Sequence, residues 1–243
     1  MIWLWLTGAW ASHALAPALY LRRRVIYGSM ERAELALTFD DGPDPRYTPL
    51  VMDILNRYGV EATFFVVGAR ARRHPELLRA IAAAGHDLGN HSYAHFPPWF
   101  QPPLLAYMDH LKTNDIVAEV VGRVPAFARA PWGAPNAGQW WATARSGQSY
   151  VHWTVHAYDW KPGISPGEIC ARVLRQVAPG GIAVLHDGSG FPGSPKVMVE
   201  ALPRLISQLQ ERFRLVPLRH WLPIIKGPEV LARDVDSLDL GSV

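Results

Sequence analysis

From Leu35 onward, short apolar runs alternate with amphipathic stretches that are bounded by glycine or proline. This alternation is typical of βα units, in which a helix returns the chain to the same end of a parallel sheet. With 243 residues, the chain is long enough to bury such units around one core, so we expect a single α/β domain. We predict strands over 34–39, 62–67, 86–89, 126–129, 149–155, 181–185 and 215–217, and helices over 48–58, 75–84, 104–121, 166–178 and 196–212.

Residues at two of the predicted helix starts support these limits. Thr48 and Pro49 offer an N-cap and a first-turn proline for the helix over 48–58. Ser165 and Glu168 have the spacing of a capping box, in which each residue satisfies a backbone N–H near the other. Both patterns therefore predict a helix that begins directly after a predicted strand or loop.

The charge balance and the single cysteine exclude some classes of protein. Lysine and arginine number 24 against 21 acidic residues, and a dispersed net charge of +3 does not indicate nucleic-acid binding. Cys170 is the only cysteine, so an intrachain disulfide is excluded, and we expect its side chain to be buried in a helix. The composition leaves the redox compartment and the oligomeric state open.

Two carboxylates and two imidazoles suggest a hydrolytic metal site. Asp40 and Asp41 end the first predicted strand, and His91 and His95 follow the strand over 86–89. A divalent metal needs a few fixed nitrogen and oxygen ligands, and hydrolysis also needs a base beside the attacking water. One carboxylate could bind while its neighbour deprotonates, although an Asp-Asp turn and an incidental histidine pair are the alternatives when either motif is taken alone.

Three further motifs also lie at or just after the ends of predicted strands. They are Arg129-Ala130-Pro131-Trp132-Gly133, Tyr158-Asp159-Trp160 and Leu185-His186-Asp187. In a (β/α) barrel, the loops that follow the strands converge on one rim, where active sites lie. The sequence therefore predicts that all of these motifs meet at one site.

In this order and spacing, the motifs resemble those of the polysaccharide deacetylases of carbohydrate esterase family 4, the NodB-type homology domain. The resemblance covers roughly residues 33–220. It implies a distorted (β/α) barrel with seven or eight strands. We therefore expect one catalytic domain over 31–225, preceded by an apolar segment over 1–30 and followed by a partly disordered tail over 226–243.

The resemblance implies a metal site and a partner. Asp41, His91 and His95 would hold a divalent metal, for which Zn²⁺ is favoured and Co²⁺, Ni²⁺, Mn²⁺ or Fe²⁺ are alternatives. The partner would be an N-acetylated glycan or glycoconjugate. The implied reaction is metal-dependent hydrolysis of its N-acetyl groups, with release of acetate.

The same resemblance assigns four residues to proton transfer. Asp40 would be the general base and His186 the general acid. Arg129 would pair with the base, and Asp159 would orient His186 and raise its pKa. The family motif often has a second aspartate at the position of His156, which puts the tuning of His186 and the shape of the substrate groove in question.

Four residues are expected to contact the substrate. The backbone N–H of Trp132 would stabilise a developing oxyanion, and its ring would line the acetyl pocket. Trp99 follows the histidine pair in a Pro-rich loop, and its flat ring could stack on a sugar. Pro131 and Leu185, which flank motif residues, complete the expected set.

Several alternatives stay open at this point. The same site could remove O-acetyl groups or hydrolyse a cyclic imide or another amide. A chain of a different class, a catalytically silent carbohydrate-binding domain, could keep the fold. Retention of a complete set of candidate ligands, base and acid argues against that last alternative.

The first 21 residues are nearly uncharged, and Arg22, Arg23 and Arg24 follow them. The stretch is about long enough to cross a bilayer. It could also be an interfacial helix or pack on the domain, because it contains Thr7, Gly8 and other residues that disfavour spanning. We expect association with a membrane or the cell envelope through residues 1–24, and the positive-inside tendency would place a spanning chain's domain on the cytoplasmic side.

Overall fold

The computed structural model of the chain describes residues 25–26, 32–188 and 194–222. The expectations for the apolar segment and for the tail therefore lie mostly outside the described residues. No helix in the described part of the chain is long and apolar enough to span a membrane.

The fold is built on one sheet in which every pairing is parallel. The strands follow the spatial order β1-β6-β5-β4-β3-β2-β8-β7, and β9 pairs with the start of β2. Their bounds are β1 Val25–Ile26, β2 Glu34–Asp40, β3 Thr63–Val66, β4 Asp87–Asn90, β5 Phe127–Ala128, β6 Ser149–Val151, β7 Val155–His156, β8 Gly181–His186 and β9 Arg214–Leu215. This arrangement confirms the α/β class and the distorted barrel.

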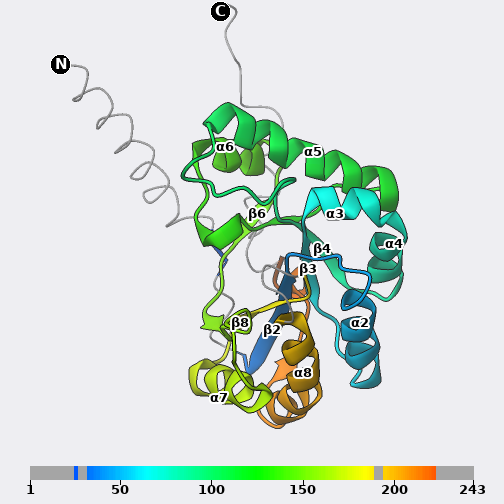
Figure 1. The fold of residues 1–243 in the computed structure, drawn as a ribbon, viewed down its shortest axis with the longest axis vertical. Coiled ribbons are helices and arrows are strands. Elements are labelled where there is room, and N and C mark those ends of the chain that lie inside the picture. Colours follow the sequence, from blue (N-terminus) through cyan, green and yellow to red (C-terminus); the bar gives the residue numbers. More distant parts are fainter. Residues whose placement is uncertain (1–24, 27–31, 189–193, 223–243) are drawn as a thin grey trace, which may run out of the picture.

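Helices pack around this sheet, with α5 and α6 at one end of the molecule and α7 and α8 at the other (Figure 1). Their bounds are α2 Thr48–Arg57, α3 Gly68–Arg73, α4 Pro75–Ala83, α5 Pro103–Val121, α6 Ala137–Arg145, α7 Pro166–Gln176 and α8 Ser194–Gln210, with 3₁₀ turns η1 Pro131–Gly133 and η2 Leu218–Trp221.

The strand β2 shows how the core positions functional side chains. Successive residues of a strand point to opposite faces, and β2 places Leu35, Leu37 and Phe39 in the large cluster that packs against the helices. Ala36, between two of these residues, lies in the smaller cluster on the other face of the sheet, together with Phe65. Asp40 shares the face of Ala36, so it points to the inner side of the sheet.

The structure confirms one helix start and corrects the other. Ser165 Oγ accepts the Glu168 N–H, and Glu168 Oε2 accepts the Ser165 N–H, so the capping box is present. Thr48 is not an N-cap but the first residue of α2. Its hydroxyl accepts the Asp44 N–H and donates to Asp187, and these partners override the local capping preference.

Other differences concern short elements. The predicted strand over 149–155 is two strands, β6 and β7, which pair with different neighbours. The strand β1 and the helices α3 and α6 were not predicted. Cys170 lies in α7 with 2% of its surface exposed, as expected.

Candidate active site

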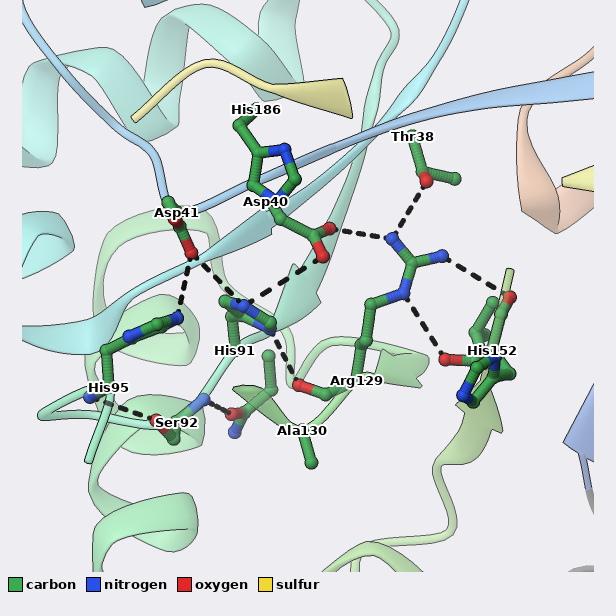
Figure 2. A network of polar contacts seen from close by, with 12 residues as sticks. Thr38, Asp40, Asp41, His91, Ser92, His95, Arg129, Ala130, His152 and His186 are labelled. Carbon is green, nitrogen blue, oxygen red and sulfur yellow. Dashed lines mark hydrogen bonds and ion pairs between the residues drawn. The ribbon is translucent and has the colours of Figure 1, made fainter. Parts of the chain in front are cut away.

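The site lies where the central strands end, on the inner side of the sheet. Asp40 is the last residue of β2 and His186 the last residue of β8, and the two are partners in the parallel register. The motif residues after β4, β5 and β7 reach the same end because all of these strands run in one direction. The close-up in Figure 2 shows Asp40, Asp41, His91, His95 and His186 gathered around one point.

Three of these residues form a group that could hold a metal ion. One ligand atom from each of Asp41, His91 and His95 can be chosen so that all three lie within 4.8 Å of one another. Asp41 Oδ1 lies 2.9 Å from His95 Nε2 and 3.3 Å from His91 Nε2. Burial favours a raised pKa for Asp41, but its contacts with both imidazoles hold the pKa well below the ordinary value, so the carboxylate is ionised.

A hydrogen bond at Nδ1 of His91 leaves Nε2 to face the candidate metal position. His91 Nδ1 lies 2.8 Å from the carbonyl oxygen of Arg129, which can only accept, so Nδ1 carries the proton. Nε2 is then the nitrogen that faces the Asp41 carboxylate, and in a neutral ring it can offer its lone pair to a cation on that side. This donor set of mixed nitrogen and oxygen therefore fits a divalent metal.

A tight loop, and not a helical turn, brings the two histidines together. Ser92 N–H donates to the side chain of Asn90 at 2.8 Å, and His95 N–H donates to Ser92 Oγ at 3.2 Å. Ser92 and His95 both have positive φ, at 61° and 50°. Hydrogen bonds between side chains and the backbone of this loop therefore bring His91 and His95 together.

Backbone strain is concentrated in the motif loops. In the described part of the chain, the residues other than glycine with positive φ are Asp41, Ser92, His95, Trp132 and Tyr158. All five belong to the motifs identified in the sequence. Such conformations cost about 1–3 kcal/mol each and persist where the surrounding structure enforces them.

Asp40 is held by a buried arginine. Asp40 Oδ1 accepts from Arg129 Nη1 at 2.6 Å, and the two side chains are 4% and 0% exposed. Oδ2 lies on the other side, 3.9 Å from His91 Nε2, and so faces the candidate metal group. One oxygen of Asp40 is therefore fixed while the other is directed to the reaction centre.

Arg129 has partners for each part of its guanidinium group. Nη1 also donates to Thr38 Oγ1 at 2.8 Å, and Nε and Nη2 donate to the carbonyl oxygens of Val151 and His152. Its Cζ atom lies 4.1 Å from the centre of the Phe65 ring. This saturation explains how a charged side chain can be almost completely buried.

A second acid–base pair lies at the end of β8. His186 Nδ1 is 2.8 Å from Asp159 Oδ1, and His186 N–H donates to Asp159 Oδ2 at 2.8 Å. Burial favours a low pKa for His186, but the charge of Asp159 outweighs it and raises the pKa to about 10. The imidazole is therefore protonated at neutral pH.

The residues expected to contact substrate do not all reach the site. Trp132 is exposed, its ring centre lies 4.7 Å from that of His95, and its N–H has no hydrogen-bond partner among the described residues. Trp99 contacts Trp132 at 5.3 Å between ring centres, and Pro131 is buried in η1 before Trp132. Leu185 lies in the core cluster on the helix side of β8, away from the site.

His156, which stands where the family motif often has an aspartate, is a neutral stacking residue. Burial and the charge of His186 lower its pKa to about 4. Its Nδ1 accepts the Tyr158 N–H, and its ring is stacked on that of Tyr158 with centres 4.0 Å apart. It therefore adds no negative charge to the surroundings of His186.

Sequence reasoning missed several residues that support the site. Thr38 holds Arg129, and Arg70 in α3 donates to the backbone oxygen of Asp41. Asn90 donates to Asn114 Oδ1 and to the His110 carbonyl oxygen. The position of Thr38, two residues before Asp40 and on the same strand face, was a usable signal for it. Nothing local in the sequence pointed to the others.

A parallel α/β barrel whose strand ends carry a candidate Asp-His-His metal group, a buried Asp–Arg pair and an Asp–His pair defines a metal-dependent hydrolase. The family model described as polysaccharide deacetylase matches residues 27–151. The chain belongs to this family.

Relatives and solved structures agree with this assignment. The chain is 37% identical over 193 residues to a peptidoglycan-N-acetylglucosamine deacetylase of Bacillus cereus, an alignment that covers 76% of the chain and 66% of that protein. It is 34% identical over 215 residues to a chitooligosaccharide deacetylase of Bradyrhizobium, covering 83% of the chain and 96% of the relative. A crystal structure of a peptidoglycan N-acetylglucosamine deacetylase in complex with 4-naphthalen-1-yl-N-oxidanyl-benzamide superposes with a TM-score of 0.76 at 34% identity, covering 85% and 94% of the two chains.

Proposed function

We propose that this chain is a metal-dependent deacetylase that hydrolyses the N-acetyl group of an amino sugar in a glycan and releases acetate. The observation that carries the proposal is the pairing of Asp40 with Arg129 and of His186 with Asp159 at the same strand ends as the Asp41-His91-His95 group. The names of the relatives support N-acetylglucosamine polymers, such as peptidoglycan or chito-oligosaccharides, as the substrate class.

We assign the metal site to Asp41, His91 and His95. A divalent cation bound there would polarise the acetyl carbonyl and lower the pKa of a water molecule at the site. Zn²⁺ suits these ligands best, and Co²⁺, Ni²⁺, Mn²⁺ and Fe²⁺ share the preference for mixed imidazole and carboxylate ligands.

Asp40 is the proposed general base. Arg129 holds Oδ1, so Oδ2 is the oxygen that takes the proton from the attacking water. The 2.6 Å contact with Arg129 also holds the Asp40 carboxylate in one orientation. The Trp132 N–H is the proposed donor to the oxyanion, a contribution of about 3 kcal/mol to the transition state when aligned.

His186 is the proposed general acid. Because its pKa is raised to about 10, the ring carries a proton that it can give to the amine nitrogen as the C–N bond breaks. Asp159 binds Nδ1, which leaves Nε2 as the nitrogen that faces the reaction centre. Trp132 and Trp99 are the proposed sugar-contacting side chains.

Acetate release tests the proposal. The substrates are acetylated chito-oligosaccharides and peptidoglycan, the protein is loaded with Zn²⁺ or Co²⁺, and Asp40→Asn is compared with wild type. Asp53→Asn, a change at an exposed aspartate of α2, is the matched control. We expect metal-dependent release that the control keeps and Asp40→Asn loses. Release that is independent of metal, or unchanged in Asp40→Asn, would contradict the mechanism.

A further inference from the structure

Large exposed hydrophobic side chains are concentrated on one side of the molecule. Ten are exposed in the described part of the chain, and six of these lie between residues 96 and 108. Trp132 and Trp141 lie against this stretch through ring contacts with Trp99 and Tyr107. Leu50 and Val124 are the two that lie elsewhere. A contiguous exposed patch of this kind marks an interaction surface more often than scattered residues do. We define the apolar face as Phe100, Leu104, Leu105, Met108 and Trp141.

The N-terminal half of α5 exposes large apolar residues, although the helix buries several polar ones. It buries His110, Thr113 and Asn114 toward the domain, while Leu105 and Met108 are 54% and 58% exposed. A surface helix ordinarily buries its apolar side and exposes its polar side. Leu105 and Met108 therefore lie outside the side of α5 that packs on the domain, where an apolar partner could reach them.

The apolar face is held firmly by the fold. Asn136 Nδ2 donates to the carbonyl oxygens of Pro98 and Gln101, at 3.0 Å each, and so ties the loop before α5 to the start of α6. Gly138 packs so closely on Pro103 that any Cβ atom there would collide with the Pro103 carbonyl oxygen. The face is therefore a preformed surface shared by two helices, which lie side by side in Figure 1.

The strand β1, which follows the apolar N-terminal part of the sequence, is linked to this face through β6 and α6. Val25 of β1 pairs with Tyr150 of β6, and the Tyr150 ring contacts that of Trp140 with centres 4.6 Å apart. Trp141, the next residue of α6, belongs to the apolar face. The segment that precedes β1 has 21 nearly uncharged residues and then Arg22–Arg24. In the sequence, the apolar stretch and the arginine cluster thus directly precede β1.

We propose that the apolar face docks on the surface of a lipid bilayer that contains anionic lipids. Aromatic side chains with a polar edge favour the headgroup level, and leucine and methionine insert into the acyl boundary. The three arginines that directly precede β1 in the sequence would contact anionic headgroups. A glycan is a poorer occupant, since Leu104, Leu105 and Met108 offer neither a flat ring for stacking nor a hydrogen bond.

Docking would also orient the active site. Trp99 borders the apolar face through its contact with Phe100, and it also contacts Trp132, which contacts the candidate ligand His95. The site would then open next to the bilayer, toward amino sugars that are anchored to or lie close to it. This orientation rests on the proposed function, whereas binding of the metal-free protein to vesicles is independent of catalysis.

Single-site labelling of the full chain tests which surface meets lipid. Cys170 is buried, so Leu105→Cys and Glu119→Cys can each be labelled selectively with an environment-sensitive fluorophore. The two positions lie near the two ends of α5. With vesicles of phosphatidylglycerol and phosphatidylethanolamine, we expect the label at 105 to brighten, shift to the blue and be quenched by nitroxide lipids. The label at 119 should stay in water. Equal responses at both positions, or none at 105, would overturn the proposal.

Vesicle affinity of matched variants provides a second measurement. Leu105→Gln combined with Met108→Gln should weaken binding by about tenfold or more, because both side chains lose apolar burial. Leu50→Gln combined with Val124→Gln alters equally exposed residues outside the face and should leave affinity unchanged. Equal loss in both pairs would overturn the proposal. The proposal would also be overturned if the label at 105 did not respond to vesicles but was protected by chito-oligosaccharides, because a glycan would then be the occupant. Protection by rising protein concentration, again without a response to vesicles, would identify a second copy as the occupant.

Discussion

Asp159 holds His186 through both its ring and its backbone: Oδ1 lies 2.8 Å from Nδ1, and Oδ2 accepts the His186 N–H at 2.8 Å. This double contact fixes the ring orientation and the charge of the proposed acid together. A raised pKa means that the contribution of this pair to stability is complete below the ordinary pKa of histidine and is lost as the pH rises through about 10.

Replacement of Asp159 by asparagine should therefore lower the pKa of His186. Burial remains in the variant while the negative charge is gone, so the ring should lose its proton at a lower pH. We expect the alkaline limb of kcat/KM to move to lower pH in Asp159→Asn. Ring-nitrogen NMR of the metal-free protein would follow His186 directly, and an unchanged titration would show that Asp159 does not control the charge.

The buried Asp40–Arg129 pair makes a prediction about stability. Arg129→Met leaves the Asp40 charge without its partner and should lower the free energy of unfolding by about 3–5 kcal/mol. Adding Asp40→Asn to that variant removes the stranded charge and should restore part of the loss. Thr38→Val, which removes one hydrogen bond to Arg129, should cost about 1 kcal/mol.

Urea denaturation of the metal-free variants measures these differences. The comparison separates a charge effect from loss of packing, because the single and double variants share the same methionine. A double variant no more stable than Arg129→Met alone would show that the cost is one of packing.

Asn90 makes a prediction about metal affinity. Its side chain accepts the Ser92 N–H and donates to Asn114, which links the histidine loop to α5. We expect Asn90→Ala to weaken Zn²⁺ binding about 10- to 100-fold, as loss of residues that orient metal ligands does. Asn136→Ala is the control, since this buried asparagine caps α6 and donates to Pro98 and Gln101, outside residues 90–95. Calorimetry should find weaker binding in the first variant only, and equal weakening in both would indicate a general loss of structure.

Asp187 makes a prediction about pH and stability. Its side chain is fully buried, and Oδ1 has no hydrogen-bond partner in the described part of the chain. Burial raises its pKa to about 7, against the effect of the hydrogen bond from Thr48. The folded protein therefore holds a proton that the unfolded chain releases near pH 4, so stability is lost as the pH rises through about 7.

Asp187→Asn should remove this dependence. The amide is neutral at every pH, and Thr48 keeps an oxygen to which it can donate. In metal-stripped protein, we expect the variant to unfold at a higher temperature than wild type at pH 8 and at a similar temperature at pH 4. The exposed Asp53→Asn serves as the control, and a variant without any advantage at pH 8 would contradict the assignment of a neutral Asp187.

The strands and their order along the chain were predictable because buried parallel strands are continuous apolar runs. The helix α6 was missed although Asn136 and Gln139 form a capping box, so a usable signal was present. The helix α3 has six residues, too few for a periodic pattern to stand out. The division of 149–155 into two strands depends on which neighbouring strand each half pairs with. The local sequence does not indicate these partners.

The motifs of the candidate site were predictable from the sequence, but the directions in which their side chains point were not all predicted. Leu185 was expected to contact substrate, yet it precedes His186 in β8 and so points to the opposite face. The period of two along a strand would have excluded it. The positive φ angles of Ser92 and His95, in contrast, depend on Asn90 and on the packing of α5, which are tertiary effects.

The strand β2 lies between β3 and β8, and so the site combines residues from early and late parts of the chain. Asp41, His91 and His95 all lie within the first 95 residues, whereas His186 belongs to the last quarter, and the hydrogen bond from Thr38 to Ala183 spans 145 residues. During synthesis, a nascent chain would therefore possess its candidate metal ligands long before its proposed proton donor. Hydrolytic activity would begin only when β8 docks on β2, so that activity reports the completion of the sheet.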